Sequence, residues 1–130
     1  MMPRTARFGA IWILGMGVLI SALLVYGFVS SRWACGESGS SFACDLSNIA
    51  VVIGAGVACL HLIVGASIWQ GQLRGVAVGA VMASLGLLAC LLLVDNEPWW
   101  LVLPFATGYL ATSLALALTL IAGLRKRGPA

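Results

Sequence analysis

The chain has 130 residues, of which 62% are hydrophobic and only 8% are charged. An ordinary soluble domain has about 25% charged residues, and a small domain needs a polar exterior because much of its surface faces water. The composition therefore excludes a soluble globular domain, a disordered chain and a nucleic-acid-binding protein. It predicts an integral membrane protein.

Four apolar segments are long enough to cross a bilayer, which takes about 20 residues of helix. None of them contains Asp, Glu, Lys or Arg, and none alternates apolar and polar residues as the strands of a membrane barrel do. The predicted fold is an all-α, four-helix transmembrane bundle with antiparallel neighbours and short loops, forming one domain over residues 1–130. The predicted spans are residues 8–29, 49–69, 76–94 and 101–124, with an outer loop at 30–48.

The charged residues are sorted between the two predicted sides of the membrane. Six of the seven Lys and Arg residues lie before the first span, between the second and third spans or after the fourth. All four Asp and Glu residues lie in the other two loops. The positive-inside rule then predicts a multi-pass protein with both termini in the cytoplasm, in a bacterial inner membrane or a plasma membrane.

Aromatic residues near the ends of the spans are typical of anchoring at the membrane interface. Trp12 and Trp69 lie near the predicted inner surface. Trp33, Trp99 and Trp100 lie near the outer one, with Tyr26 a turn inside it. We expect these side chains to face the lipid headgroups.

Cys35 and Cys44 lie in the predicted outer loop, on the oxidising side of the membrane. Paired thiols there predict a disulfide that closes a loop of about ten residues and stabilises the fold by about 2–3 kcal/mol. A redox-active pair is the alternative. Cys59 and Cys90 lie inside spans, where a free cysteine behaves as a small apolar side chain.

The Cys35 and Cys44 pair also carries a family resemblance. A loop pair of cysteines after the first of four spans resembles that of the vitamin K epoxide reductase family. Members of that family relay electrons from the loop pair to a C-x-x-C beside a quinone, near the outer end of the fourth span. This chain has no C-x-x-C, and its corresponding segment reads EPWWLVLPFATGY. The resemblance therefore implies a loop pair and not the reductase activity.

His61 is the only histidine and lies near the middle of the second span. An ionisable residue at that depth is a candidate functional residue. Three interpretations stay open: a hydrogen bond to a hydroxyl group at the same depth, a proton relay, and an axial haem ligand. Haem would need a second ligand from a partner chain, and a metal site needs three or four ligands, so no cofactor and no metal is predicted. The candidate midplane polar residues are His61, Ser84, Thr112 and Ser113.

Small residues recur every four positions in the third and fourth spans. This spacing lets helix backbones approach closely. The neighbouring helix can belong to the same chain or to another one. The predicted packing residues are Gly75, Gly79, Ala83, Ala111 and Ala115.

No catalytic set is recognisable in the sequence, so an enzyme is not predicted. No span contains a carboxylate, although coupled transport usually needs one or an unwound polar segment. We expect a small non-catalytic subunit, or an assembly or stabilising factor, of a larger membrane complex. Its expected partners are the lipid bilayer and other integral membrane subunits, and not nucleic acid. The alternatives are a small homo-oligomeric transporter or channel that uses His61, and a thiol–disulfide redox helper that uses Cys35 and Cys44.

Overall fold

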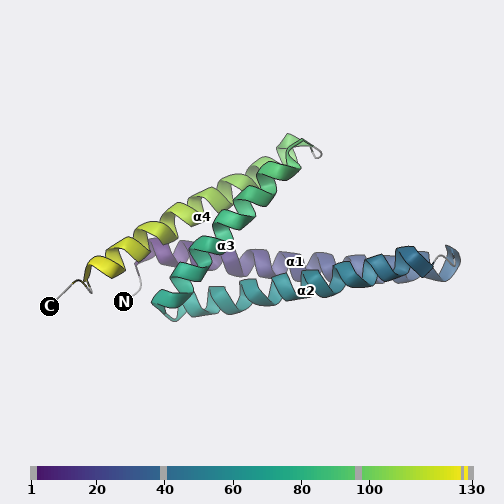
Figure 1. Ribbon diagram of the computed structural model, residues 1–130, viewed down its shortest axis with the longest axis horizontal. Coiled ribbons are helices and arrows are strands. Elements are labelled where there is room, and N and C mark those ends of the chain that lie inside the picture. The colour runs from purple at the N-terminus through teal and green to yellow at the C-terminus, as the bar shows by residue number, and fades with distance from the viewer. Residues whose placement is uncertain (1–2, 39–40, 96–97, 127, 129–130) are drawn as a thin grey trace. The chain divides into compact units, whose positions relative to one another are not determined.

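The computed structural model describes residues 3–38, 41–95, 98–126 and 128, with the side chains of 31–38 and 41–43 left out. The described chain forms four helices and contains no strand. Each helix includes a stretch long and apolar enough to cross a membrane, so the predicted all-α fold with four such helices is confirmed. The helices are α1 (Arg4–Ser38), α2 (Ser41–Trp69), α3 (Leu73–Leu93) and α4 (Trp99–Lys126) (Figure 1).

The segment predicted as an outer loop is mostly helical, because α1 continues to Ser38 and α2 begins at Ser41. The prediction ended the first helix where the apolar run ends. A helix outside the membrane needs only its backbone hydrogen bonds, and no proline interrupts residues 4–97. The Ser30 hydroxyl also donates to the backbone carbonyl oxygen of Tyr26 at 2.7 Å. The 35 residues of α1 suffice for about 52 Å of helix, more than the hydrocarbon core of about 30 Å.

A tight turn around Gly71 joins α2 to α3. The φ of Gly71 is 77°, in the left-handed region that glycine adopts without a steric penalty. Its N–H donates to the Ile68 carbonyl oxygen at 2.8 Å, and the Gln72 N–H donates to that of Ser67 at 3.1 Å. These bonds satisfy carbonyl groups at the end of α2. As a result α3 begins at Leu73, and the connection is shorter than predicted.

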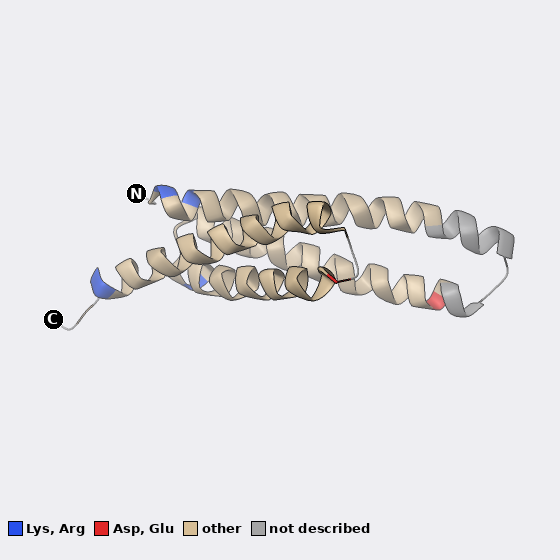
Figure 2. Ribbon diagram, turned by 90° about the horizontal axis from the view of Figure 1, so that it is seen from above, with Lys and Arg blue, Asp and Glu red and all other residues tan. Residues whose placement is uncertain are grey.

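The chain divides into two compact units, the first comprising Met1–Leu14 and Val64–Ala130. It contains the start of α1, the end of α2, and α3 and α4, and these segments share one apolar core. The three core residues of α1 are spaced by four and three positions, which places them on one face of that helix. The core residues are Ala6, Ala10, Ile13, Val64, Ile68, Val76 and Leu116. The Lys and Arg residues described in this unit gather at the starts of α1 and α3 and the end of α4 (Figure 2).

The second unit, Gly15–Ile63, contains the rest of α1 and α2. A Cβ atom on Gly17 would lie 3.0 Å from the Leu62 side chain, and Gly54 faces the Leu24 side chain. Gly17 of α1 is paired with Leu62 of α2, whereas the later residue Leu24 is paired with the earlier residue Gly54. The two helices therefore run antiparallel and form a hairpin. Their close approach depends on the missing side chains of the two glycines.

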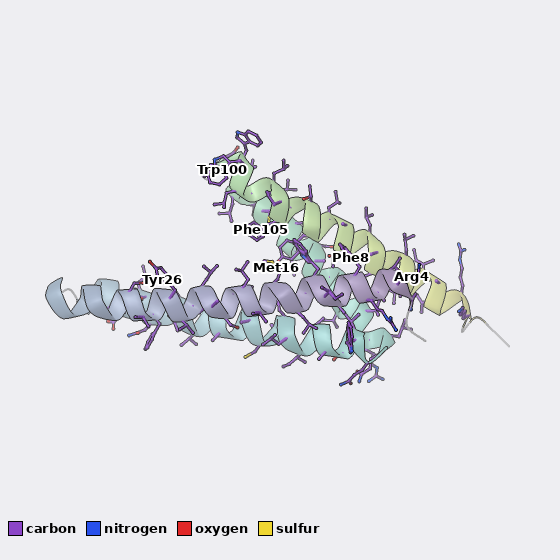
Figure 3. The ribbon with its side chains drawn as sticks, turned by 180° about the vertical axis from the view of Figure 1, so that it is seen from behind. Arg4, Phe8, Met16, Tyr26, Trp100 and Phe105 are labelled. Atoms are coloured by element: carbon purple, nitrogen blue, oxygen red, sulfur yellow. The ribbon has the colours of Figure 1, made fainter. Side chains whose placement is uncertain are left out.

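Several of the predicted interfacial aromatic residues are exposed. Tyr26 is 74% exposed and Trp100 is 63% exposed, and both side chains project away from the helices that carry them (Figure 3). Trp69 and Trp99 are also exposed. Such positions suit contact with lipid headgroups.

Candidate functional site

Two of the predicted midplane residues bond to each other across the α3–α4 interface. The Oγ atoms of Ser84 and Ser113 lie 2.9 Å apart. Ser84 also donates to the Ala80 carbonyl oxygen at 2.9 Å. Because a serine has a single hydroxyl proton, Ser113 is the donor in the pair. The bond between the helices contributes about 0.6 kcal/mol to stability, the average for such bonds in membranes.

Thr112 is fully buried in the first unit, with 0% exposure. Its Oγ1 has no hydrogen-bond partner in the described part of the chain. A buried hydroxyl without a partner costs about 1–3 kcal/mol. Thr112 therefore differs from its neighbour Ser113, whose hydroxyl is used between helices.

His61 belongs to the second unit and is 7% exposed. Its Nδ1 lies 2.8 Å from the Val57 carbonyl oxygen, one turn earlier in α2. Because a carbonyl oxygen can only accept a hydrogen bond, Nδ1 carries the hydrogen and is the donor of this bond. This bond fixes the orientation of the ring along α2. The hydroxyl-bonded, proton-relay and haem interpretations of His61 stay predictions.

The cysteines fall into two groups. Cys59, on the exposed face of α2, and Cys90, buried in α3, are free thiols. Cys44 lies near the start of α2 and is half-buried. The Cys35 side chain lies outside the described part of the chain, so the disulfide between the two stays a prediction. Among the described residues, no group of three or more His, Cys, Asp or Glu is placed to hold a metal.

The small residues of α3 point into the first unit. Gly75, Gly79 and Ala83 are all buried. A Cβ atom on Gly75 would lie 2.9 Å from the Ser67 carbonyl carbon and 3.0 Å from the Ile68 nitrogen. The backbones of α2 and α3 therefore approach each other directly beside the turn.

The exposure of the small-residue face of α4 changes along the helix. Ala115 is half-buried within the first unit, whereas Ala111 and Thr107 are exposed. The Thr107 hydroxyl donates to the carbonyl oxygens of Leu103 and Pro104, both at 2.9 Å. Because that hydroxyl is satisfied within its own helix, Thr107 and Ala111 present a small surface with little polarity.

An aromatic contact in the first unit was not apparent in the sequence. Trp12 and Tyr109 meet edge to face, and Tyr109 is only 7% exposed. Trp12 packs against Gly108, and Tyr109 packs against Gly86. The prediction that Trp12 is an interfacial anchor is wrong, because its ring lies against α4 and its Nε1 is buried without a partner in the described chain. The sequence does contain glycines at 86 and 108, against which large rings can pack. It gives no indication that Trp12 and Tyr109 are the rings that do so.

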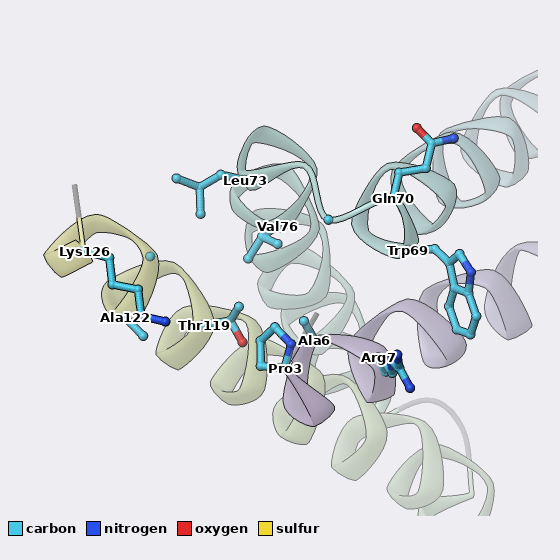
Figure 4. Close-up of a pocket in the computed structure, with 12 residues that line it drawn as sticks. Pro3, Ala6, Arg7, Trp69, Gln70, Leu73, Val76, Thr119, Ala122 and Lys126 are labelled. Atoms are coloured by element: carbon cyan, nitrogen blue, oxygen red, sulfur yellow. The ribbon is translucent and has the colours of Figure 1, made fainter. Parts of the chain in front are cut away.

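A pocket with a volume of about 710 Å³ lies where the first unit carries its Lys and Arg residues (Figure 4). The start of α1, the α2–α3 turn and the end of α4 form it. Its lining combines the cations of Arg7 and Lys126 with the Thr119 hydroxyl and apolar side chains. Thr119 donates to the Ala115 carbonyl oxygen at 2.8 Å and accepts from Thr5 at 3.0 Å. The second bond ties the start of α1 to α4 beside the pocket.

These features define a small helical membrane protein in which many polar side chains of the described spans bond to the chain's own helices. No protein-family model, curated protein or solved structure matches the chain. Its function is therefore inferred from its own residues.

Proposed function

We propose that the chain is a small non-catalytic integral membrane subunit, or an assembly or stabilising factor, of a larger membrane complex. The observation that carries the proposal is the exposed half of the small-residue face on α4, at Thr107 and Ala111. Lipid tails are as apolar as leucine side chains, so a leucine-rich face gains little by meeting a helix instead of lipid. A face of small residues does gain, because it lets a second backbone come close and form many van der Waals contacts.

The same proposal places both termini in the cytoplasm of a bacterial inner membrane or a plasma membrane. It is supported by the gathering of Arg and Lys residues at one end of the first unit (Figure 2), and by Asp95 just beyond the other end of α3. Lys and Arg near the ends of spans are retained on the cytoplasmic side. The Cys35 and Cys44 pair then faces the oxidising side, where a disulfide is stable.

Site-specific photo-crosslinking in native membranes tests the partner surface. A photoreactive residue replaces Ala111, and the matched control replaces Ala89, an exposed alanine of α3. We expect position 111, and not position 89, to capture a larger membrane protein. Capture of a second copy of this chain at 111 would contradict the proposal and favour a homo-oligomer.

A homo-oligomeric transporter or channel is the second candidate, and it is favoured by the nearly complete burial of His61. An ionisable residue held at that depth often marks a transport path. Flux through the reconstituted protein that is unchanged by His61→Ala would count against this candidate.

The redox helper is the third candidate and depends on Cys35 and Cys44. A redox-active pair must open during turnover and pass through a mixed disulfide with its partner. Acid trapping of the thiols followed by non-reducing electrophoresis detects both species. A pair that stays bridged throughout is structural.

A further inference from the structure

The pocket in the first unit has cations on more than one of its walls. Arg7 reaches it from α1 and Lys126 from α4, and Figure 4 shows the two residues on opposite sides of the view. The two side chains are 119 positions apart in the chain, so the fold brings them to one pocket. Two cations in the lining of one pocket favour an anion with several acceptor oxygens, such as a phosphate group.

No acidic side chain of the described chain lines the pocket. Asp95, the acidic residue of the first unit that the structure describes, lies just beyond the opposite end of α3. Neither Arg7 nor Lys126 forms an ion pair within the described residues. The first turn of α3, which also borders the pocket, contains no acidic residue and has no side-chain cap from Gln72.

The pocket also offers the apolar surface that a lipid requires. It lies at helix ends, and the exposed indole of Trp69 is part of its lining. Tryptophan at such a position is typical of the headgroup level of a membrane. Leu73, Val76 and Ala122 supply apolar surface beside the cations, which suits the glycerol backbone and the first carbons of an acyl chain.

We propose that this pocket binds the headgroup phosphate of an anionic phospholipid, with Arg7 and Lys126 donating to the phosphate oxygens. Binding there would hold the start of α1, the α2–α3 turn and the end of α4 together. The inference does not depend on the proposed partner complex, because it concerns only this chain and the bilayer.

Native mass spectrometry of the purified full-length chain tests the site through titration with phosphatidylglycerol, phosphatidylcholine or inorganic phosphate. We expect phosphatidylglycerol to bind at least tenfold more tightly than the other two. The double substitution Arg7→Gln with Lys126→Gln should weaken phosphatidylglycerol binding by about 30-fold, from about 1 kcal/mol for each cation near a membrane surface. The matched control, Arg74→Gln with Arg125→Gln, removes the same charge from exposed residues outside the pocket lining. This control should weaken phosphatidylglycerol binding less than threefold.

Two variants that change size but not charge distinguish lipid binding in the pocket from lipid attraction to the positively charged end of the protein. Ala122→Trp fills the pocket from α4 without changing charge, whereas Leu118→Trp enlarges a 63%-exposed residue one turn away. We expect only Ala122→Trp to reduce phosphatidylglycerol binding, with helix content unchanged by circular dichroism.

Three results would overturn the proposal. Equal losses in the two charge variants would show that net charge alone attracts the lipid. Equal binding of phosphatidylcholine would remove the requirement for an anionic headgroup. Inorganic phosphate that binds as tightly as phosphatidylglycerol would assign the pocket to a soluble anion.

Discussion

Trp12 of α1 and Tyr109 of α4 meet edge to face, with ring centroids 6.1 Å apart and ring planes at 83°. Such pairs contribute about 0.5–1.5 kcal/mol beyond the burial of their surfaces. Each ring also rests against a glycine, Gly108 for Trp12 and Gly86 for Tyr109. The contact therefore joins the start of α1 to α4, and Tyr109 in turn packs α4 against α3 within the first unit.

Gly86→Ala should destabilise the protein by about 1–3 kcal/mol, the usual cost of adding a methyl group to a packed interior. The new Cβ atom would lie 2.5 Å from the Tyr109 ring, and that ring is buried and has little room to move. Unfolding in a detergent mixture of increasing denaturing strength measures the change. Gly15→Ala is the control, because no described atom lies within 4 Å of its Cβ position. An equal loss in both variants would show that the effect is not due to packing against Tyr109.

Gly75→Ala should be at least as costly, because the obstacle is the backbone of Ser67 and Ile68. A side chain can rotate away from an added methyl group, but a backbone beside a tight turn cannot do so without moving α2 or α3. Gly56→Ala, with no described atom within 4 Å, is the helix control and should be neutral or slightly stabilising. Unfolding under the same conditions gives both values. A neutral Gly75→Ala would mean that α2 and α3 are farther apart.

Thr112→Val should be neutral or should stabilise the protein by up to about 1 kcal/mol, because it replaces an unpartnered buried hydroxyl with a methyl group of similar size. Ser113→Ala should instead cost about 0.6 kcal/mol. In a double-mutant cycle with Ser84→Ala, that loss should largely disappear. Destabilisation by Thr112→Val would show that the Thr112 hydroxyl has a partner.

Much of this fold could be predicted from hydropathy. A bilayer selects for uninterrupted apolar helices, so the four spans are visible in the sequence. The extension of α1 to Ser38 was not, because helix outside the membrane depends on backbone bonding and on the absence of proline rather than on apolarity. The role of Trp12 was also missed, since its position near a span end is compatible with both an interfacial anchor and a packed interior. The Arg7–Lys126 pocket depends on tertiary structure, and spacing along the chain gives no sign of it.

Cys44→Ser should lower stability by about 2–3 kcal/mol if the predicted bridge to Cys35 forms, through the loss of a constraint on the unfolded chain. Dithiothreitol should destabilise the original chain and leave the variant unchanged. Cys59→Ser, which removes a free thiol, is the control and should keep the response to reductant. No response in the original chain would mean that the two cysteines are not bridged.

The mass of the native assembly tests the central proposal most directly. The tagged chain is extracted from its own membrane in a mild detergent and analysed intact by native mass spectrometry. A subunit or assembly factor should appear in a particle that contains larger membrane proteins, with a mass that is not a multiple of the 13.5 kDa chain. A monomer, or an assembly of this chain alone, would contradict the proposal.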